Sequence, residues 1–97
     1  MLIDQEDLML VREILKAHVP DRRVKAFGSR VHGRHLRKFS DLDLVVMGNE
    51  PLAFEAYCKL KEAFEESDLP IRVDVGQWVR MDKNFRKIIE ESNEDVQ

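Results

Sequence analysis

The sequence predicts one small domain of the α/β or α+β class, in which helices and short strands alternate along the chain. Segments with helical spacing of apolar residues are separated by short apolar runs that are typical of strands. The chain has 97 residues, of which 43% are hydrophobic and 36% charged, as in a globular domain with a charged surface. No segment approaches the roughly 18 consecutive apolar residues of a membrane span. We therefore expect residues 1–97 to form a single domain.

The first helix is expected from residue 4 to about residue 18. Asp4 can cap its first turn, and four apolar residues then keep helical spacing: Leu8, Val11, Ile14 and Leu15. Pro20 ends this helix. The short apolar segment 24–27 predicts a strand, and Gly28 ends it.

The middle of the chain predicts a turn, a loop and a second strand. Residues 29–33 are long enough for a turn or one short helix, and a basic loop continues to Ser40. Residues 41–47 alternate at first and then become wholly apolar, which indicates a strand buried on both faces at its far end. The polar residues 48–51 predict a loop.

The second half of the chain repeats the alternation. A helix is expected from about residue 52 to residue 67, and a third strand at residues 71–75. The last helix is expected over residues 83–92, with Asp82 as its cap. The acidic residues 90–97 predict a flexible tail at the end of the chain.

Charge is distributed unevenly. The net charge is −3, yet residues 22–38 hold seven basic residues and no acidic one, which leaves nine basic and all nineteen acidic residues elsewhere. A local positive field in an acidic protein predicts a phosphate-bearing ligand or an acidic partner surface, whereas the overall acidity makes nucleic acid an unexpected partner. Three cations of this stretch either steer a triphosphate, dock an acidic partner or are simply solvated: Arg34, Arg37 and Lys38.

Two features predict a cytoplasmic protein. The single cysteine, Cys58, cannot form an internal disulfide, and no Cys/His group has the spacing of a zinc site. The first seven residues have neither the basic region nor the apolar core of a secretory signal.

Asp41 and Asp43 are candidates for a metal site. Residues two apart on a strand project from the same face, with Cα atoms roughly 6.5–7 Å apart. Carboxylates so placed can share Mg²⁺ or hold two ions, because Mg²⁺ takes a few hard oxygen ligands and completes its shell with water and substrate phosphates. A structural alternative is that Asp41 closes a turn and Asp43 pairs with an arginine.

Gly28, Ser29 and Arg30 are candidates for phosphate binding. A glycine at the end of a strand allows close approach of a ligand, and a helix starting at Ser29 would offer free N–H groups to an anion. The Ser29 hydroxyl and the Arg30 guanidinium could add further donors to phosphate oxygens. An ordinary turn would explain the same tripeptide.

Asp74 is the candidate for a third carboxylate. It lies among apolar residues in the expected third strand, where an unpaired charge would be costly to bury. If this strand lies beside the one that carries Asp43, the carboxylates come together; otherwise Asp74 is an edge residue that faces water.

Together these motifs resemble the minimal nucleotidyltransferases of the DNA polymerase beta superfamily. The resemblance covers nearly the whole chain: a leading helix, Phe27-Gly28-Ser29-Arg30 after the first strand, Ser40-Asp41-Leu42-Asp43 on the second, and Asp74 on the third. The connection to Asp41 is one residue longer than the usual spacing in the family. The extra residue falls in the loop 34–39, where one added residue has a small cost in folding free energy.

The resemblance implies a polymerase-beta-like fold, a small mixed sheet packed by helices, and a two-metal reaction. Asp41 and Asp43 would bind two Mg²⁺ ions, and Asp74 would complete the catalytic metal site and help to activate the attacking hydroxyl. Gly28 and Ser29 would hold the β- and γ-phosphates of ATP. The hydroxyl would attack the α-phosphorus and release pyrophosphate.

Many members of this group resemble antitoxins encoded beside a helical HEPN-type toxin, and some transfer AMP to a tyrosine of that toxin. The resemblance therefore implies an antitoxin that transfers a nucleoside monophosphate to a hydroxyl of such a partner. A binding module that neutralises its partner by complex formation, with weak or absent transfer, is the alternative. No acceptor domain fits in this chain, so the acceptor site is expected to come from a partner or from a second copy in a homo-oligomer.

Overall fold

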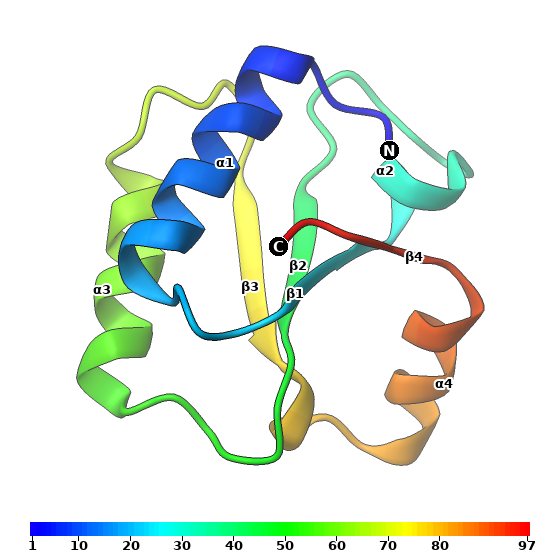
Figure 1. The fold of residues 1–97 in the computed structure, drawn as a ribbon. Coiled ribbons are helices and arrows are strands. Elements are labelled where there is room, and N and C mark those ends of the chain that lie inside the picture. Colours follow the sequence, from blue (N-terminus) through cyan, green and yellow to red (C-terminus); the bar gives the residue numbers. More distant parts are fainter.

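The computed structural model describes all residues from Met1 to Gln97 and contains a four-stranded mixed sheet with helices on both faces (Figure 1). The elements follow the order α1 (Gln5–His18), β1 (Val24–Phe27), α2 (Ser29–His32), β2 (Leu42–Val46), α3 (Phe54–Glu65), β3 (Val73–Gln77), a 3₁₀ turn η1 (Trp78–Arg80), α4 (Lys83–Glu91) and β4 (Asn93–Asp95). This arrangement confirms the predicted class and the alternation of helices and strands. No helix has the length and apolar character needed to cross a membrane.

The strand order is β3-β2-β1-β4. β1 pairs antiparallel with β2 and with β4, whereas β2 and β3 run parallel. A parallel pair needs a crossover connection, and α3 supplies it between β2 and β3. As a result β2 and β3 begin at the same edge of the sheet, the upper edge in Figure 1.

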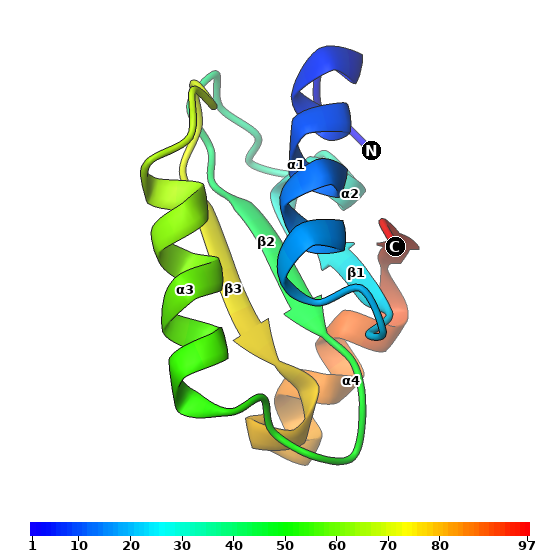
Figure 2. The same ribbon diagram turned by 60° about the vertical axis from the view of Figure 1, so that its left-hand side comes forward.

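The main core lies between one face of the sheet and the helices α1 and α3, which cover that face side by side (Figure 2). Its twelve buried residues lie in α1, α3, β1, β2 and β3, or directly after α1 and β4: Val11, Leu15, Val19, Val24, Ala26, Leu42, Leu44, Val46, Leu60, Phe64, Val75 and Val96. Alternate residues of β1 and β2 contribute to this core, so the residues between them face the opposite side.

Helix α4 covers only the lower part of that opposite face (Figures 1 and 2). Val45 and Ile89 are buried outside the main core, and Phe27 packs edge-on against Phe85 with ring centroids 5.8 Å apart. The expected cap of this helix is confirmed, because Asp82 accepts a hydrogen bond from the N–H of Phe85 at 2.8 Å. The upper part of the face, where β2 and β3 begin, has no helix over it.

The prediction of a flexible acidic tail at residues 90–97 is wrong. Residues 93–95 form β4 on the outer edge of β1, and Val96, only 5% exposed, completes the main core. The side-chain amide of Gln97 donates hydrogen bonds to the carbonyls of Val19 and Arg22 at 2.8 and 3.0 Å. The acidic composition indicates a solvated segment, but Asp95 lies beside Arg23 and Lys25 at the edge of β1.

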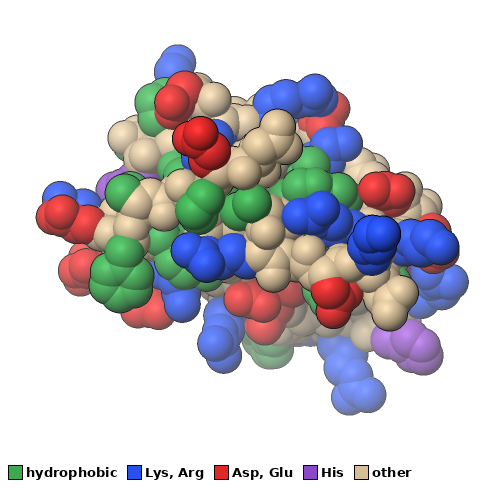
Figure 3. Space-filling view, turned by 90° about the horizontal axis from the view of Figure 1, so that it is seen from below, with side chains coloured by type: hydrophobic (Ala, Val, Ile, Leu, Met, Phe, Trp, Pro, Cys, Tyr) green, Lys and Arg blue, Asp and Glu red, His purple; other side chains and the backbone are tan.

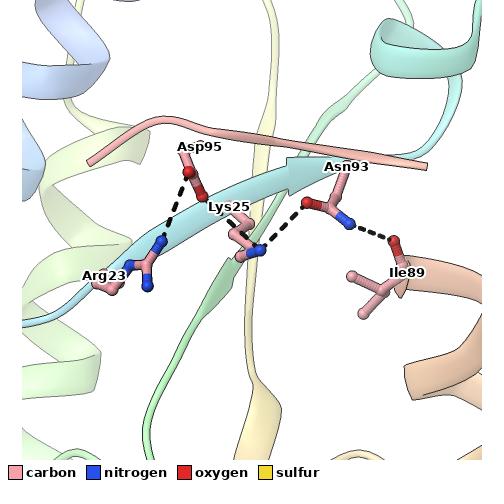
Figure 4. Close-up of polar contacts among 5 residues, drawn as sticks. All are labelled: Arg23, Lys25, Ile89, Asn93 and Asp95. Carbon is pink, nitrogen blue, oxygen red and sulfur yellow. Dashed lines mark hydrogen bonds and ion pairs between the residues drawn. The ribbon is translucent and has the colours of Figure 1, made fainter. Parts of the chain in front are cut away.

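Figure 4 shows these contacts along the outer edge of β1. Lys25 lies between Asn93 and Asp95, with distances of 3.3 and 3.7 Å, and Arg23 lies 3.5 Å from Asp95. Asn93 also donates to the carbonyl of Ile89 near the end of α4, at 3.0 Å. The segment is therefore held by side chains at both ends as well as by the strand pairing.

Candidate nucleotide and metal site

Two of the three predicted carboxylates are direct neighbours in the sheet. Asp43 and Asp74 are paired Cα positions of the parallel strands β2 and β3, so their side chains leave the same face about 5 Å apart. Asp41 directly precedes β2, which begins one residue later than predicted. The condition set for Asp74 is met, because its strand lies beside the strand of Asp43.

These carboxylates lie on the open part of the sheet. Leu42 and Leu44, on either side of Asp43, are fully buried in the main core, so Asp43 faces the side that α1 and α3 leave free. Asp43 is half-buried, whereas Asp41 and Asp74 are exposed. A ligand can therefore reach all three from solvent.

The pKa of Asp43 is shifted upward from its ordinary value. Burial raises its pKa from 3.8 to about 6, and the negative charges of Asp74 and then Asp41 contribute in the same direction. No cation of the chain makes an ion pair with Asp43, so the structural alternative of an arginine partner is not what the structure shows. A negative cluster without a partner on an open face is an arrangement that a bound cation would stabilise.

Gly28 lies against this cluster. Phe27 is the cross-strand partner of Asp43, and a Cβ atom on Gly28 would overlap the Asp43 carboxylate. The φ angle of Gly28 is +81°, in a region that favours glycine. Both facts explain why glycine is needed at this point, and they place the turn that starts α2 beside the carboxylates.

The turn itself has the expected form. Residues 29–32 form the short helix α2, and the N–H groups of Val31 and His32 donate to the carbonyl of Gly28 at 2.9 and 3.1 Å. The first N–H groups of a helix have no partner within it, so the backbone at Ser29 can donate to an anion. Ser29 is half-buried next to Gly28, and its role as a phosphate ligand stays a prediction.

Arg30 has a different position from the one expected of a phosphate ligand. Its side chain is 8% exposed, and the guanidinium donates to three backbone carbonyls: Leu2 at 2.7 Å, Ser40 at 2.9 Å and Lys38 at 3.2 Å. These bonds use its Nε and both Nη groups. Arg30 therefore fixes the N-terminal segment and the loop before Asp41. The sequence gives no signal for this role, because the three acceptors are main-chain atoms.

The donor set fits magnesium. Three carboxylates lie near one another, and Mg²⁺ prefers hard oxygen ligands completed by phosphates and water. The carboxylates do not form a metal site by themselves, because no group of three or more acidic, His or Cys side chains is arranged to hold a metal ion. Asp41, Asp43 and Asp74 would thus supply part of the coordination shell.

An α/β domain with a glycine-serine turn beside paired carboxylates on an open sheet face has the design of a nucleotide-transferring enzyme. Residues 8–96 match the family described as nucleotidyltransferase domain. The chain belongs to this family, and its fold is that of the polymerase-beta-like nucleotidyltransferases.

One named protein and several solved structures are similar to this chain. The chain is 53% identical over 87 residues, 90% of its length, to a protein from Haemophilus influenzae named probable protein adenylyltransferase MntA, of which the match covers 75%. A crystal structure described as a toxin-antitoxin with AMP-PNP has a TM-score of 0.73 at 20% identity, covering 93% of this chain and 72% of that one.

Another solved structure contains a tri-AMPylated HEPN toxin from Shewanella oneidensis in complex with an MNT antitoxin. It has a TM-score of 0.70 at 15% identity and covers 98% of this chain and 72% of that chain. At these identities the solved structures show a shared fold. The predicted family and class of enzyme are confirmed, while the roles of individual residues stay predictions.

Proposed function

We propose that this nucleotidyltransferase moves AMP from ATP to a hydroxyl of a partner protein, with Mg²⁺, and acts as an antitoxin. The observation that carries the proposal is the contact of Gly28 with Asp43, which is itself paired with Asp74. This contact supports a site in which a phosphate-binding turn lies beside a metal-binding pair. The 53% identity to a probable protein adenylyltransferase supports AMP as the group transferred.

The partner we propose is a HEPN-type toxin with a tyrosine as the acceptor. Structures with the same fold are described as toxin-antitoxin complexes, and one contains an AMPylated HEPN toxin. Asp41 and Asp74 are exposed, so an acceptor supplied by a partner or by a second copy could reach them. The single, exposed Cys58 and the absence of a disulfide agree with action in the cytoplasm.

We assign each site residue a role according to its position. Gly28 and Ser29 bind and orient the β- and γ-phosphates, and Asp41 and Asp43 would hold Mg²⁺. Bound Mg²⁺ would supply neutralisation of the charge that develops on the phosphates. Asp74, exposed at the edge of the cluster, receives the proton of the acceptor hydroxyl at a carboxylate oxygen. The hydroxyl oxygen then bonds to the α-phosphorus, the bond to the β-phosphate breaks, and pyrophosphate leaves.

The Asp74→Asn variant tests the catalytic assignment. The purified protein encoded beside this chain is incubated with labelled ATP and Mg²⁺, and mass spectrometry locates any nucleotide adduct. We expect Asp74→Asn to lower transfer by at least about 100-fold, the usual scale for loss of general acid-base catalysis. Affinity for ATP should change little, because Asp41, Asp43, Gly28 and Ser29 remain. Asp95→Asn, a similar change at an exposed position of β4, is the control.

Binding without transfer is the second candidate and a distinct outcome. If the wild-type protein suppresses the toxicity of its partner but never labels it, neutralisation by complex formation replaces the catalytic proposal. If Asp74→Asn labels the partner as well as wild type does, Asp74 is not part of the catalytic site. If the protein neither binds nor labels that partner, the antitoxin proposal fails.

A further inference from the structure

The loop between α2 and β2 displays cations and an aromatic ring to solvent. We define the basic loop as residues 34–39. Its four basic side chains, counting His35, are all exposed, and so is 69% of Phe39. Phe54 is the only large hydrophobic side chain of the molecule that is more exposed than Phe39.

The basic loop is held in one conformation. The buried guanidinium of Arg30 donates to the carbonyls of Lys38 and Ser40, on either side of Phe39, at 3.2 and 2.9 Å. The N–H of Ser40 donates to the carbonyl of Arg37 at 3.1 Å, and the N–H of Arg37 donates to the Ser40 hydroxyl at 2.8 Å. Phe39 is thus presented by a closed turn. A fixed turn has less conformational freedom to lose on binding than a mobile loop has.

Phe39 is suited to anchor a protein contact. The ammonium of Lys38 lies 5.4 Å from the ring centroid and covers part of the ring, while the rest remains exposed. Phe39 also lines a cavity of about 550 Å³ together with Leu2, Ile3 and Ile71. Aromatic residues in or beside such hollows are enriched at the centres of protein interfaces.

The charged side chains of the basic loop itself are all basic, although Asp4 and Asp7 line the same cavity as Phe39. Residues 22–38 contain no acidic side chain. By contrast, Phe54 is followed by Glu55, which forms an ion pair with Lys59 at 3.4 Å. Figure 3 shows the lower end of the molecule, where acidic and basic side chains are interspersed around the hydrophobic ones. The basic loop thus combines an exposed aromatic side chain with a local run of exposed basic side chains.

We propose that the basic loop is the docking surface for the acceptor protein, and that this partner presents acidic side chains around an apolar pocket for Phe39. Charge complementarity favours an acidic protein surface, because the exposed basic side chains of the loop create a local positive field that attracts such a partner. Only Ser40 separates the loop from Asp41, so a partner docked on the loop lies near the carboxylates. The inference rests on the proposed function and identifies the surface on which the acceptor protein binds.

The test measures association with the purified protein encoded beside this chain, by surface plasmon resonance at low and physiological salt. We expect Phe39→Ala to weaken the complex at least tenfold, mainly through faster dissociation. The combined charge reversal of Arg34, Arg37 and Lys38 to Glu should slow association at least tenfold at low salt. Phe54→Ala, which removes an equally large exposed ring at the other end of the molecule, should change the affinity less than twofold. Phe39→Ala and Phe54→Ala should keep the wild-type melting temperature and affinity for Mg-ATP.

The outcomes separate this inference from the proposed function. If wild type binds and labels the partner while the loop variants bind it equally well, the docking surface lies elsewhere and the proposed function stands. If wild type forms no complex with that partner, the proposed function and the inference fall together. If the loop variants lose affinity for a single-stranded RNA oligonucleotide but not for the protein, the basic loop is a nucleic-acid surface and the inference is overturned.

Discussion

Arg30 donates its Nε–H to the carbonyl of Ser40 at 2.9 Å, and this bond joins the glycine-serine turn to the residue that precedes Asp41. The two halves of the proposed site come from different elements, α2 and β2, with the basic loop between them. The Arg30 guanidinium is the direct side-chain link between them. Arg30 is 8% exposed, so a variant that loses these bonds would leave polar atoms of the side chain buried without partners.

Replacing Arg30 with lysine should therefore weaken binding of Mg-ATP. Lysine keeps the charge but cannot reach three carbonyls at fixed angles, so unfolding should become easier by about 1–3 kcal/mol. We expect the Kd for Mg-ATP, measured by calorimetry, to rise about tenfold. Arg22→Lys is the matched control, because Arg22 donates to the carbonyl of Met47 at 3.0 Å beyond the other end of β2. If both variants bind Mg-ATP alike, Arg30 supports the fold without positioning the site.

Gly28→Ala should damage the site and the fold together. The added Cβ would strike the Asp43 carboxylate, and the backbone angles of Gly28 are ones that only glycine adopts readily. We expect a loss of about 2 kcal/mol or more in a urea unfolding experiment, together with loss of ATP binding. Gly33→Ala is the comparison, because Gly33 also has a positive φ, +77°, but its Cβ would meet only the tip of Leu2 at 3.4 Å. Its expected cost is about 1–2 kcal/mol, with ATP affinity retained.

The stability of the metal-free protein should fall as the pH rises from about 4 to about 6.5. The folded protein holds a proton on Asp43 more tightly than the unfolded chain does, since burial and the neighbouring carboxylates raise this pKa from 3.8 to about 6. The stabilising contribution is therefore complete below the unfolded pKa and is lost as the pH passes through the folded one. Allowing for solvent screening of a half-buried group, we expect a difference of about 1–2 kcal/mol.

Denaturant unfolding at several pH values compares wild type with Asp43→Asn. The variant should lack this part of the pH dependence and should be more stable than wild type at neutral pH. Asp95→Asn should keep the wild-type profile, because Asp95 lies on β4 and is not among the charges that raise the Asp43 pKa. Identical profiles for wild type and Asp43→Asn would show that the Asp43 pKa is not raised.

The last residues of the chain should contribute to the free energy of unfolding more through packing than through charge. Val96 is 5% exposed within the main core, so Val96→Ala should lower the free energy of unfolding by about 1–2 kcal/mol. Asp95 makes ion pairs of 3.5 and 3.7 Å with side chains that are themselves partly or largely exposed, and Asp95→Asn should cost less than about 0.5 kcal/mol. Thermal unfolding of both variants distinguishes the two contributions. A larger loss from Asp95→Asn than from Val96→Ala would reverse this order.

The sequence predicted the parts of the fold that depend on local pattern. The period of the apolar residues located α1, α3 and α4, and Gly28 marked the end of β1, because these signals arise within one element. The pairing of Asp43 with Asp74 could only be stated as a condition, since it depends on β2 and β3 being neighbours. The bonds of Arg30 involve main-chain acceptors, and β4 depends on the free edge of β1; neither leaves a local pattern.

The pairing of β4 with β1 has a consequence for the order in which the chain folds. Lys25 and Asn93 are 68 residues apart, so the outer edge of β1 stays open during synthesis until the ribosome has released β4. An open edge strand is a template for pairing with another chain. Two nascent chains that exchanged their last strands would rebuild every contact of β4, which makes strand exchange the characteristic misassembly of this topology.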